Sequence, residues 1–251
     1  MLKVENVSVS YGPFLAVNNA SMHVNAGETI GLAGTNGAGK TTLFAAIAGQ
    51  LTATSGSISF NGQDILHQPT YKRAGIGLCR TFQIPREFGK LSVLENLLVA
   101  AQDRSQENML TAWLRRGTMK DTTTQRTAQA DQILDTLGIT HVRDLPASQL
   151  SGGQKKLLEL ARVLMQQPTL ILLDEPFAGV NPVRIGEMMD IFRRLKEQGI
   201  ALLIVEHHLQ ALKSLCSRLY VMDQGVVIAE GDPDNVLNST IVQEAYMGGV
   251  I

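Results

Sequence analysis

The segment Gly34–Thr41 has the residue types and spacing of a phosphate-binding loop. Its sequence, GTNGAGKT, matches the pattern G-x-x-x-x-G-K-[ST] at every fixed position. Glycines in such a loop let main-chain N–H groups point at phosphates, while the lysine reaches the terminal phosphates and the hydroxyl binds Mg²⁺. Lys40 and Thr41 are the expected lysine and hydroxyl. The candidate nucleotide-binding residues here are Gly34, Thr35, Asn36, Gly37, Ala38, Gly39, Lys40, Thr41 and Thr42.

Two adjacent carboxylates, Asp174 and Glu175, follow the apolar run Leu170–Leu173. The run predicts a buried strand that ends at these two residues. Beside a phosphate loop, Asp174 is suited to bind Mg²⁺ and Glu175 to polarise a water molecule for in-line attack on a phosphate. Without such a loop, an acidic turn that caps the next helix would explain the pair equally well.

A second glycine-rich segment, Leu150–Gln154 (LSGGQ), lies far downstream of the first. Ser151 and Gln154 have the spacing of a capping box, which would begin a helix. A capping box does not require Gly152 and Gly153, each of which costs a helix about 1 kcal/mol relative to alanine. Glycines are favoured where the main chain must approach an anion closely. We therefore interpret this segment as a second phosphate-binding site.

Alternating or apolar segments separated by helices predict an α/β fold with a mostly parallel sheet. Strands are expected at residues 2–10, 20–25, 28–33, 56–61, 170–173 and 200–205. A helix should follow the phosphate loop from Lys40 to Ala48, and another should begin at Asn181–Pro182. Ligands of such sheets bind at the carboxyl ends of the strands. The phosphate loop, the Asp174–Glu175 pair and His207 all come at such ends.

The region from about Pro85 to Leu150 is more polar and has a helical pattern. One helix is expected at residues 95–101, and apolar residues at i, i+3, i+4 and i+7 predict another that ends at Gly138. Residues 102–127, between them, are rich in Gln, Thr and charge. We interpret the region as a helical insertion into the α/β core.

Composition narrows the class of protein further. The 251 residues are 44% hydrophobic and 18% charged, which allows a sizeable core, and the net charge of -1 does not indicate a nucleic-acid partner. Cys79 and Cys216 match no disulfide framework, so we expect reduced thiols. No apolar run approaches the roughly 20 residues that span a bilayer. A cytoplasmic protein is the expectation, and any membrane association would need a partner.

The phosphate loop, the LSGGQ segment and the apolar strand with Asp-Glu, in that order, resemble the ATP-binding subunit of ATP-binding cassette (ABC) transporters. The resemblance covers essentially the whole chain. It implies a P-loop NTPase (RecA-like) core with a mostly parallel sheet, an N-terminal antiparallel β subdomain and an inserted α-helical subdomain. The core would comprise residues 1–84 and 151–251, and the helical subdomain residues 85–150.

The same resemblance gives roles to three residues that would be ordinary by themselves. Tyr11 corresponds to the aromatic residue that stacks on adenine. Gln83 corresponds to the glutamine that contacts Mg²⁺ and the attacking water. His207 corresponds to the histidine that contacts the γ-phosphate. Glu175, His207 and Gln83 are thus the expected catalytic residues, and Thr41, Gln83 and Asp174 the expected Mg²⁺ ligands.

Departures from the family pattern are mild. Lys155–Lys156 follows the signature, Asn181 replaces a usual aspartate, and His208 stands where aspartate is common. None removes a catalytic group, so we expect an active ATPase that uses ATP and Mg²⁺. Several segments resemble the branched-chain amino acid importer ATPases: Arg80–Gln83, 102–127, Ala178–Pro182, and Ile228–Gly231 with the short tail to Ala245–Gly248. Urea and amide importers are close relatives. Lipopolysaccharide-transport ATPases have a similar tail but are expected to have a shorter middle region.

The resemblance implies a head-to-tail dimer of two such ATPase subunits, the same or related. Each ATP would be held by the phosphate loop of one subunit and by Ser151, Gly152, Gly153 and Gln154 of the other. The expected partners are membrane permease subunits and, indirectly, an extracytoplasmic solute-binding protein. The expected place is the cytoplasmic face of the inner membrane, held there by the permease.

Two other classes of protein compete with the transporter. A soluble ABC ATPase acting in DNA repair or on ribosomes would carry long coiled-coil insertions or two cassettes, and neither is present. A P-loop kinase or GTPase would leave the Ser151–Gln154 segment and His207 unexplained. We therefore favour a transport ATPase without a nucleic-acid partner.

Overall fold

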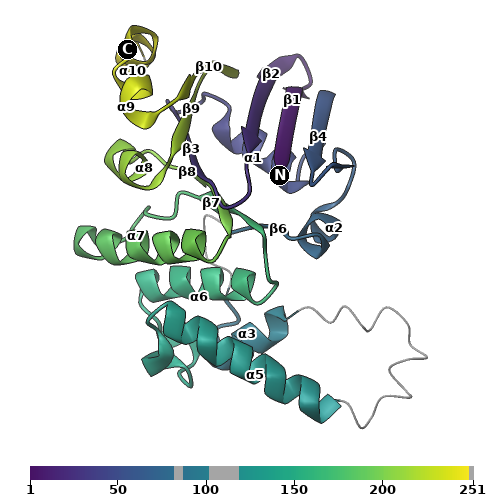
Figure 1. Ribbon diagram of the computed structural model, residues 1–251, viewed down its shortest axis with the longest axis vertical. Helices are drawn as coiled ribbons and strands as arrows, with labels where there is room; N and C mark the ends of the chain where they lie inside the picture. Colours follow the sequence, from purple (N-terminus) through teal and green to yellow (C-terminus); the bar gives the residue numbers. More distant parts are fainter. Residues whose placement is uncertain (82–86, 102–118, 249–251) are drawn as a thin grey trace. The chain divides into compact units, whose positions relative to one another are not determined.

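The computed structural model describes residues 1–81, 87–101 and 119–248 (Figure 1). The chain folds as two compact units. The first comprises Met1–Gln83 and Pro168–Ile251, and the second comprises Ile84–Gln167. The helical subdomain predicted from the sequence ends at residue 150, whereas the second unit of the structure extends to Gln167.

An antiparallel sheet opens the first unit, with strand order β2-β1-β4-β5. Its strands are β1 (Leu2–Tyr11), β2 (Phe14–Val24), β4 (Ser55–Phe60) and β5 (Gln63–Asp64). Positions in β2 from Ala20 onward alternate between buried and exposed. Such alternation is typical of a sheet that faces a core on one side and solvent on the other.

The second sheet of this unit has six strands in the order β10-β9-β3-β8-β7-β6. They are β3 (Thr29–Gly34), β6 (Leu78–Arg80), β7 (Leu170–Asp174), β8 (Ala201–Val205), β9 (Arg218–Asp223) and β10 (Val226–Gly231). All pairs are parallel except β9 with β10. Every residue of β3, β7 and β8 is buried, as expected for parallel strands covered on both faces. The predicted α/β class is thereby confirmed.

Helices complete the first unit. They are α1 (Lys40–Ala48), α2 (Thr70–Gly75), α7 (Pro182–Glu197), α8 (Leu209–Leu215), α9 (Pro233–Leu237) and α10 (Thr240–Gly248). Helix α1 contacts strands of both sheets, and its Leu43, Phe44 and Ile47 belong to one apolar core with them. On the six-stranded sheet, α8, α9 and α10 pack against β3, β9 and β10 respectively (Figure 1).

The second unit is helical where it is described. It contains α3 (Val93–Ala100), α5 (Met119–Thr136), α6 (Gly152–Leu164) and the short 3-10 turns Thr140–Val142 and Ala147–Gln149. Helices α3, α5 and α6 pack on one another. This packing explains why α6 belongs to this unit and why the unit continues past residue 150.

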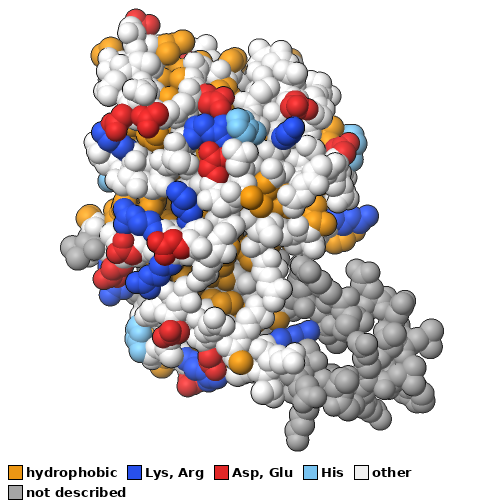
Figure 2. Space-filling model, in the orientation of Figure 1, with side chains coloured by type: hydrophobic (Ala, Val, Ile, Leu, Met, Phe, Trp, Pro, Cys, Tyr) orange, Lys and Arg blue, Asp and Glu red, His pale blue; other side chains and the backbone are white. Residues whose placement is uncertain are grey.

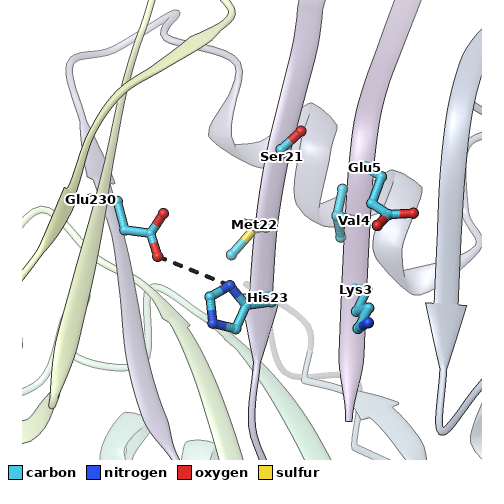
Figure 3. Close-up of a pocket in the computed structure, with 7 residues that line it drawn as sticks. All are labelled: Lys3, Val4, Glu5, Ser21, Met22, His23 and Glu230. Carbon is cyan, nitrogen blue, oxygen red and sulfur yellow. Dashed lines mark ion pairs between the residues drawn. The ribbon is translucent and has the colours of Figure 1, made fainter.

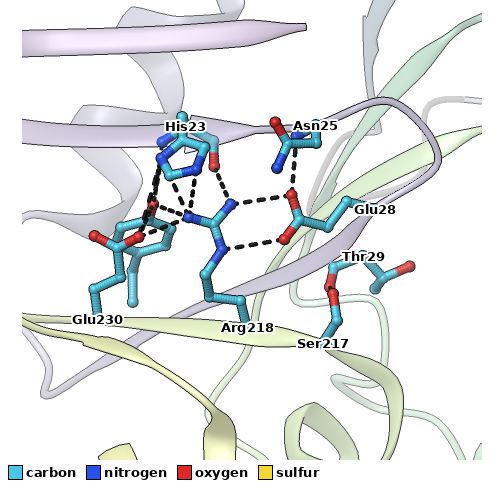
Figure 4. A network of polar contacts seen from close by, with 8 residues as sticks. His23, Asn25, Glu28, Thr29, Ser217, Arg218 and Glu230 are labelled. Atoms are coloured by element: carbon cyan, nitrogen blue, oxygen red, sulfur yellow. Dashed lines mark hydrogen bonds and ion pairs between the residues drawn. The ribbon is translucent and has the colours of Figure 1, made fainter.

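A polar network in the first unit ties the start of β9 to the end of β2 (Figure 4). The Arg218 guanidinium donates hydrogen bonds to both carboxylate oxygens of Glu28, at 3.0 and 3.1 Å, and to Glu230 Oε1 at 2.6 Å. It also donates to the main-chain oxygen of His23 at 3.0 Å. Since His23 lies in β2 and Glu230 in β10, the network joins the two sheets. His23 and Glu230 also line an open pocket of about 290 Å³ beside the network. Figure 3 shows the two side chains facing each other.

On the face shown in Figure 2, acidic and basic side chains lie next to one another. Over the described ranges, no helix has both the length and the apolar character needed to cross a membrane.

Candidate functional site

The phosphate loop connects the end of β3 at Gly34 to the start of α1 at Lys40. Two of its glycines are required by the backbone. A Cβ atom on Gly34 (φ 146°) would lie 2.2 Å from the carbonyl oxygen of Met222, and one on Gly39 (φ 96°) would lie 2.5 Å from that of Ala16. Both neighbours are main-chain atoms, so neither glycine can gain a side chain without moving a strand. The loop is therefore held close to β2 and β9 in a shape that needs glycine.

Lys40 places its charge on the inner side of this loop. Its side chain is 5% exposed, and its Nζ donates to the main-chain oxygens of Gly34 and Thr35, both at 2.8 Å. Burial lowers the pKa of Lys40, and the carboxylates of Glu175 and Asp174 partly offset this. The loop, the ammonium group and the two carboxylates thus form one electrostatic cluster.

Asp174 ends β7 as a buried carboxylate with 4% side-chain exposure. Its Oδ2 accepts a hydrogen bond from Nη2 of Arg80 at 2.6 Å. Arg80 ends the adjacent parallel strand β6, which explains how the two side chains meet. The segment that contains Arg80 could be picked out in the sequence, but the contact of Arg80 with Asp174 could not, because nothing in the sequence says that β6 pairs with β7.

Glu175 follows directly and has an unusual backbone, with φ of 48°. Its N–H donates to the carbonyl oxygen of Val205, at the end of β8. Its Oε1 lies 3.1 Å from Nε2 of His207, which makes a hydrogen bond when that nitrogen carries the proton. The two residues that were predicted to act on the attacking water and the γ-phosphate are therefore direct neighbours.

Glu206 is a residue that sequence analysis missed. It is buried, with 4% exposure, between the loops after β7 and β8. Its Oε1 accepts from the N–H of Phe177 at 2.8 Å, and its Oε2 accepts from the N–H groups of His207 and His208 at 2.9 and 3.2 Å. A carboxylate bonded in this way fixes both loops. Its position directly before His207 at a strand end was the available signal.

The remaining predicted residues of the first unit lie at more open positions. Thr41 is exposed and Thr42 half-buried in the first turn of α1. Tyr11 is 49% exposed at the end of β1, where it pairs with Phe14 of β2. Gln83 lies outside the described residues. The structure thus brings the phosphate loop, Asp174, Glu175 and His207 to one edge of the sheet, and Tyr11 lies at the end of the other sheet.

The Ser151–Gln154 segment belongs to the second unit and begins α6. The capping box is made: the N–H of Ser151 donates to Gln154 Oε1 at 2.9 Å, and the N–H of Gln154 donates to Ser151 Oγ at 3.4 Å. Within the described part of the chain, no heavy atom lies within 4 Å of a Cβ built on Gly152 or Gly153, outside their own helix turn. Packing inside this chain therefore does not account for the two glycines.

The donor set fits a hard cation that is shared with phosphates. In the described ranges, no group of three or more His, Cys, Asp or Glu side chains is arranged to hold a metal ion. Thr41 and Asp174 offer oxygen atoms, which Mg²⁺ prefers, and Mg²⁺ sites on nucleotides commonly use one or two protein ligands with substrate phosphates. Asp174 and the hydroxyl of Thr41 match that kind of site.

Comparisons with known proteins match this chain to ATP-binding proteins of transport systems. The model of the ABC transporter family matches residues 17–178. A probable branched-chain amino acid transport ATP-binding protein LivG of Archaeoglobus fulgidus is 38% identical, with 99% of this chain and 95% of the relative covered. The lipopolysaccharide export system ATP-binding protein LptB of Haemophilus influenzae is 36% identical, with 99% and 97% covered. LivG and LptB proteins therefore match this chain about equally well.

Solved structures agree with the fold. The ADP conformation of an ATP-binding cassette of an ABC transporter superposes with a TM-score of 0.85 at 36% identity, covering 99% of this chain and 98% of the other. A nucleotide-free cassette superposes with a TM-score of 0.83, also at 36% identity, covering 98% of each chain.

Proposed function

Since this chain belongs to the ABC transporter family, we propose that it is the ATP-hydrolysing subunit of a branched-chain amino acid importer. The single observation that carries the catalytic part is the contact between Glu175 and His207 beside the Lys40 loop. The solute is supported by the identity to LivG proteins of two archaea, Archaeoglobus fulgidus and Methanocaldococcus jannaschii.

The nucleotide would bind to residues 34–42. Main-chain N–H groups of the loop and the Lys40 ammonium are suited to the phosphates, because both supply positive charge to them. Thr41 and Asp174 would hold Mg²⁺, which neutralises charge on the phosphate oxygens when it is bound. Tyr11 would stack on the adenine ring, and Gln83 would contact the metal ion and the attacking water.

Glu175 would accept the proton of the attacking water. Its carboxylate is 22% exposed, so water can reach it, and His207 lies within hydrogen-bond distance of it. His207 would contact the γ-phosphate. Glu206 would hold the backbone of His207 in place, because its carboxylate accepts a hydrogen bond from the main-chain N–H of His207. A base held beside a phosphate binder in this way fits in-line attack of water on a phosphate.

The signature segment would bind the ATP of a second subunit. Ser151, Gly152 and Gly153 begin α6, where N–H groups and the helix dipole favour an anion. The open space around both glycines supports a ligand that comes from outside the chain. The functional unit would therefore be a head-to-tail dimer bound to permease subunits at the cytoplasmic face of the inner membrane. An extracytoplasmic binding protein would deliver the solute.

The helical unit, near residues 84–97, would receive cytoplasmic helices of the permease. ATP-driven closure of the dimer would move this part and with it the permease helices, since closure of domains around a substrate is a common step in enzymes. The alternative cargo is lipopolysaccharide, because LptB proteins match this chain at 35–36% identity over nearly its whole length.

The replacement Glu175→Gln tests the catalytic assignment. We expect steady-state ATP hydrolysis to fall by at least about 10²-fold, because the water loses its base. ATP binding should remain, and the variant should form dimers that depend on ATP in size-exclusion chromatography. Wild-type turnover in this variant would contradict the role of Glu175.

The solute is tested separately with the permease complex that copurifies with this protein from its native membranes. Vesicles that contain the complete complex should take up radiolabelled leucine when ATP and a binding protein are supplied. Transfer of lipopolysaccharide without leucine uptake would establish the alternative cargo.

A further inference from the structure

Arg80 makes an incomplete set of contacts for a buried arginine. Its side chain is 10% exposed, and its guanidinium contacts Asp174, Gln50 and the face of Phe44, whose ring centre lies 5.0 Å away. Its Nε is buried and has no hydrogen-bond partner among the described residues. Buried polar atoms are nearly always satisfied, so the surroundings of Arg80 are not those of an arginine with a purely structural role.

Arg73 shows what a purely structural arginine looks like in the same unit. It is 1% exposed and donates to the main-chain oxygens of Gln68, Ala46, Ile47 and Leu66. All of its nitrogen atoms donate hydrogen bonds, and among the described residues no carboxylate forms an ion pair with it. Arg80 differs because it forms an ion pair with Asp174, the carboxylate proposed to bind Mg²⁺.

The geometry points to Arg80 as a positioning residue that competes with Mg²⁺ for Asp174 and so sets the metal affinity of the ATP-bound subunit. This inference rests on the proposed role of Asp174. The Arg80 guanidinium takes Oδ2 of that carboxylate at 2.6 Å and compensates its charge. A cation so close to a carboxylate weakens the attraction for a second cation, and in a buried site the effect is only partly screened.

Lys40 strengthens the competition. Its ammonium group interacts with the same Asp174 carboxylate, so two fixed positive charges already act on it. The phosphates of ATP would engage Lys40, and Asp174 would then depend on Arg80 and the metal ion. In this arrangement the ion binds tightly only once the nucleotide is in place. Loss of the Arg80 charge should therefore raise metal affinity rather than lower it.

The test is a titration of Mn²⁺ into full-length protein with bound AMP-PNP, with free Mn²⁺ measured by electron paramagnetic resonance. Binding of Mn²⁺ to AMP-PNP alone is subtracted. For Arg80→Gln we expect the dissociation constant for Mn²⁺ to fall by about tenfold, and for Arg80→Lys, which keeps the charge, a change of less than about threefold. An unchanged or higher dissociation constant in Arg80→Gln would overturn the inference.

Gln50→Met provides an opposite prediction that does not remove a buried charge. Gln50 is exposed and accepts a hydrogen bond from Nη1 of Arg80. Without it, Arg80 depends more on Asp174, so Mn²⁺ should bind about two- to threefold more weakly. This variant keeps the test decisive if Arg80→Gln does not fold, since unaltered Mn²⁺ binding in Gln50→Met then contradicts the competition.

Arg73→Gln is the matched control for a lost buried arginine. It should lower thermal stability and leave the dissociation constant for Mn²⁺ unchanged. A change as large as that in Arg80→Gln would mean that any loss of a buried arginine perturbs the site, and the inference would fail. A wild-type protein that adds nothing to the Mn²⁺ affinity of free AMP-PNP would instead contradict the proposed nucleotide site itself.

Discussion

Glu206 shows how one buried carboxylate can organise two loops, those after β7 and β8. It accepts three main-chain hydrogen bonds, from Phe177 after β7 and from His207 and His208 after β8. Hydrogen bonds to an ionised acceptor are stronger than neutral ones. The position of the His207 side chain near Glu175 therefore depends on a residue that touches neither water nor phosphate in the proposed reaction.

The replacement Glu206→Gln tests this dependence. Glutamine keeps the shape but offers one acceptor oxygen in place of two and lacks the charge, so we expect a loss of about 1–3 kcal/mol in the free energy of unfolding. ATP hydrolysis should fall more than ATP affinity, because the loop of His207 loosens while the phosphate loop stays. Urea denaturation and steady-state kinetics measure the two effects. Glu187→Gln, at an exposed position of α7, is the control and should change neither.

Residues that belong to a contiguous motif could be predicted from the sequence, whereas their contacts could not. The loop glycines, Lys40 and the Asp174–Glu175 pair are close in sequence and carry their own spacing. Arg80 and Glu206 act through the order of the strands, with β6 beside β7 and β7 beside β8. That order depends on pairing between distant segments, which a single sequence does not reveal.

The same contrast appears at the level of elements. Strands that are buried on both faces were predicted nearly in place: 28–33 became Thr29–Gly34, and 200–205 became Ala201–Val205. The strand expected at 20–25 is longer, because β2 already pairs with β1 from Phe14. The three-residue strand β6 was missed because so short a segment has no periodicity to detect.

The start of α6 can separate folding from function. Gly152→Ala adds a methyl group in open space and removes a glycine from a helix, so we expect stability to stay the same or rise by up to about 1 kcal/mol. The same methyl group should block the approach of the second subunit's ATP. Combined with Glu175→Gln, it should abolish ATP-dependent dimers in size-exclusion chromatography.

Gly186→Ala is the matched control for that helix variant. Gly186 lies in α7, and in the described part of the chain nothing stands within 4 Å of a Cβ built on it outside its own helix turn. ATP-dependent dimers should persist in this control. Dimers that also persist in Gly152→Ala would contradict the proposal that the signature segment binds a second nucleotide.

At the scale of the whole molecule, the first unit joins two sheets around one core, and helix α1 contributes to both sides of it. The phosphate loop is clamped between them, since Gly34 and Gly39 touch main chain of β9 and β2. The two sheets are also joined on their polar side by Arg218, Glu28 and Glu230 (Figure 4). Loss of that network should therefore lower the global stability of the protein and leave the phosphate loop unaffected.

The network also predicts how stability depends on pH. Burial raises the pKa of Glu28, but hydrogen bonds from Arg218 and from the Asn25 N–H outweigh this effect, so the pKa is lowered. Burial also raises the pKa of Glu230, and hydrogen bonds from Tyr220 and Arg218 again outweigh it, so this pKa is lowered too. Carboxylates with a lowered pKa in the folded state stabilise it above their unfolded pKa of about 4.3, and this stabilisation is lost as the pH falls through the folded pKa. Wild-type urea midpoints should therefore drop below about pH 5.

Arg218→Met should be less stable at pH 7, and its urea midpoint should fall less steeply with decreasing pH, because the variant no longer favours the ionised forms of Glu28 and Glu230. Arg193→Met is the control. It removes an exposed ion pair with Asp190, so its urea midpoint should depend on pH as that of the wild type does. If the midpoint of Arg218→Met fell as steeply as that of the wild type, other carboxylates would control acid stability.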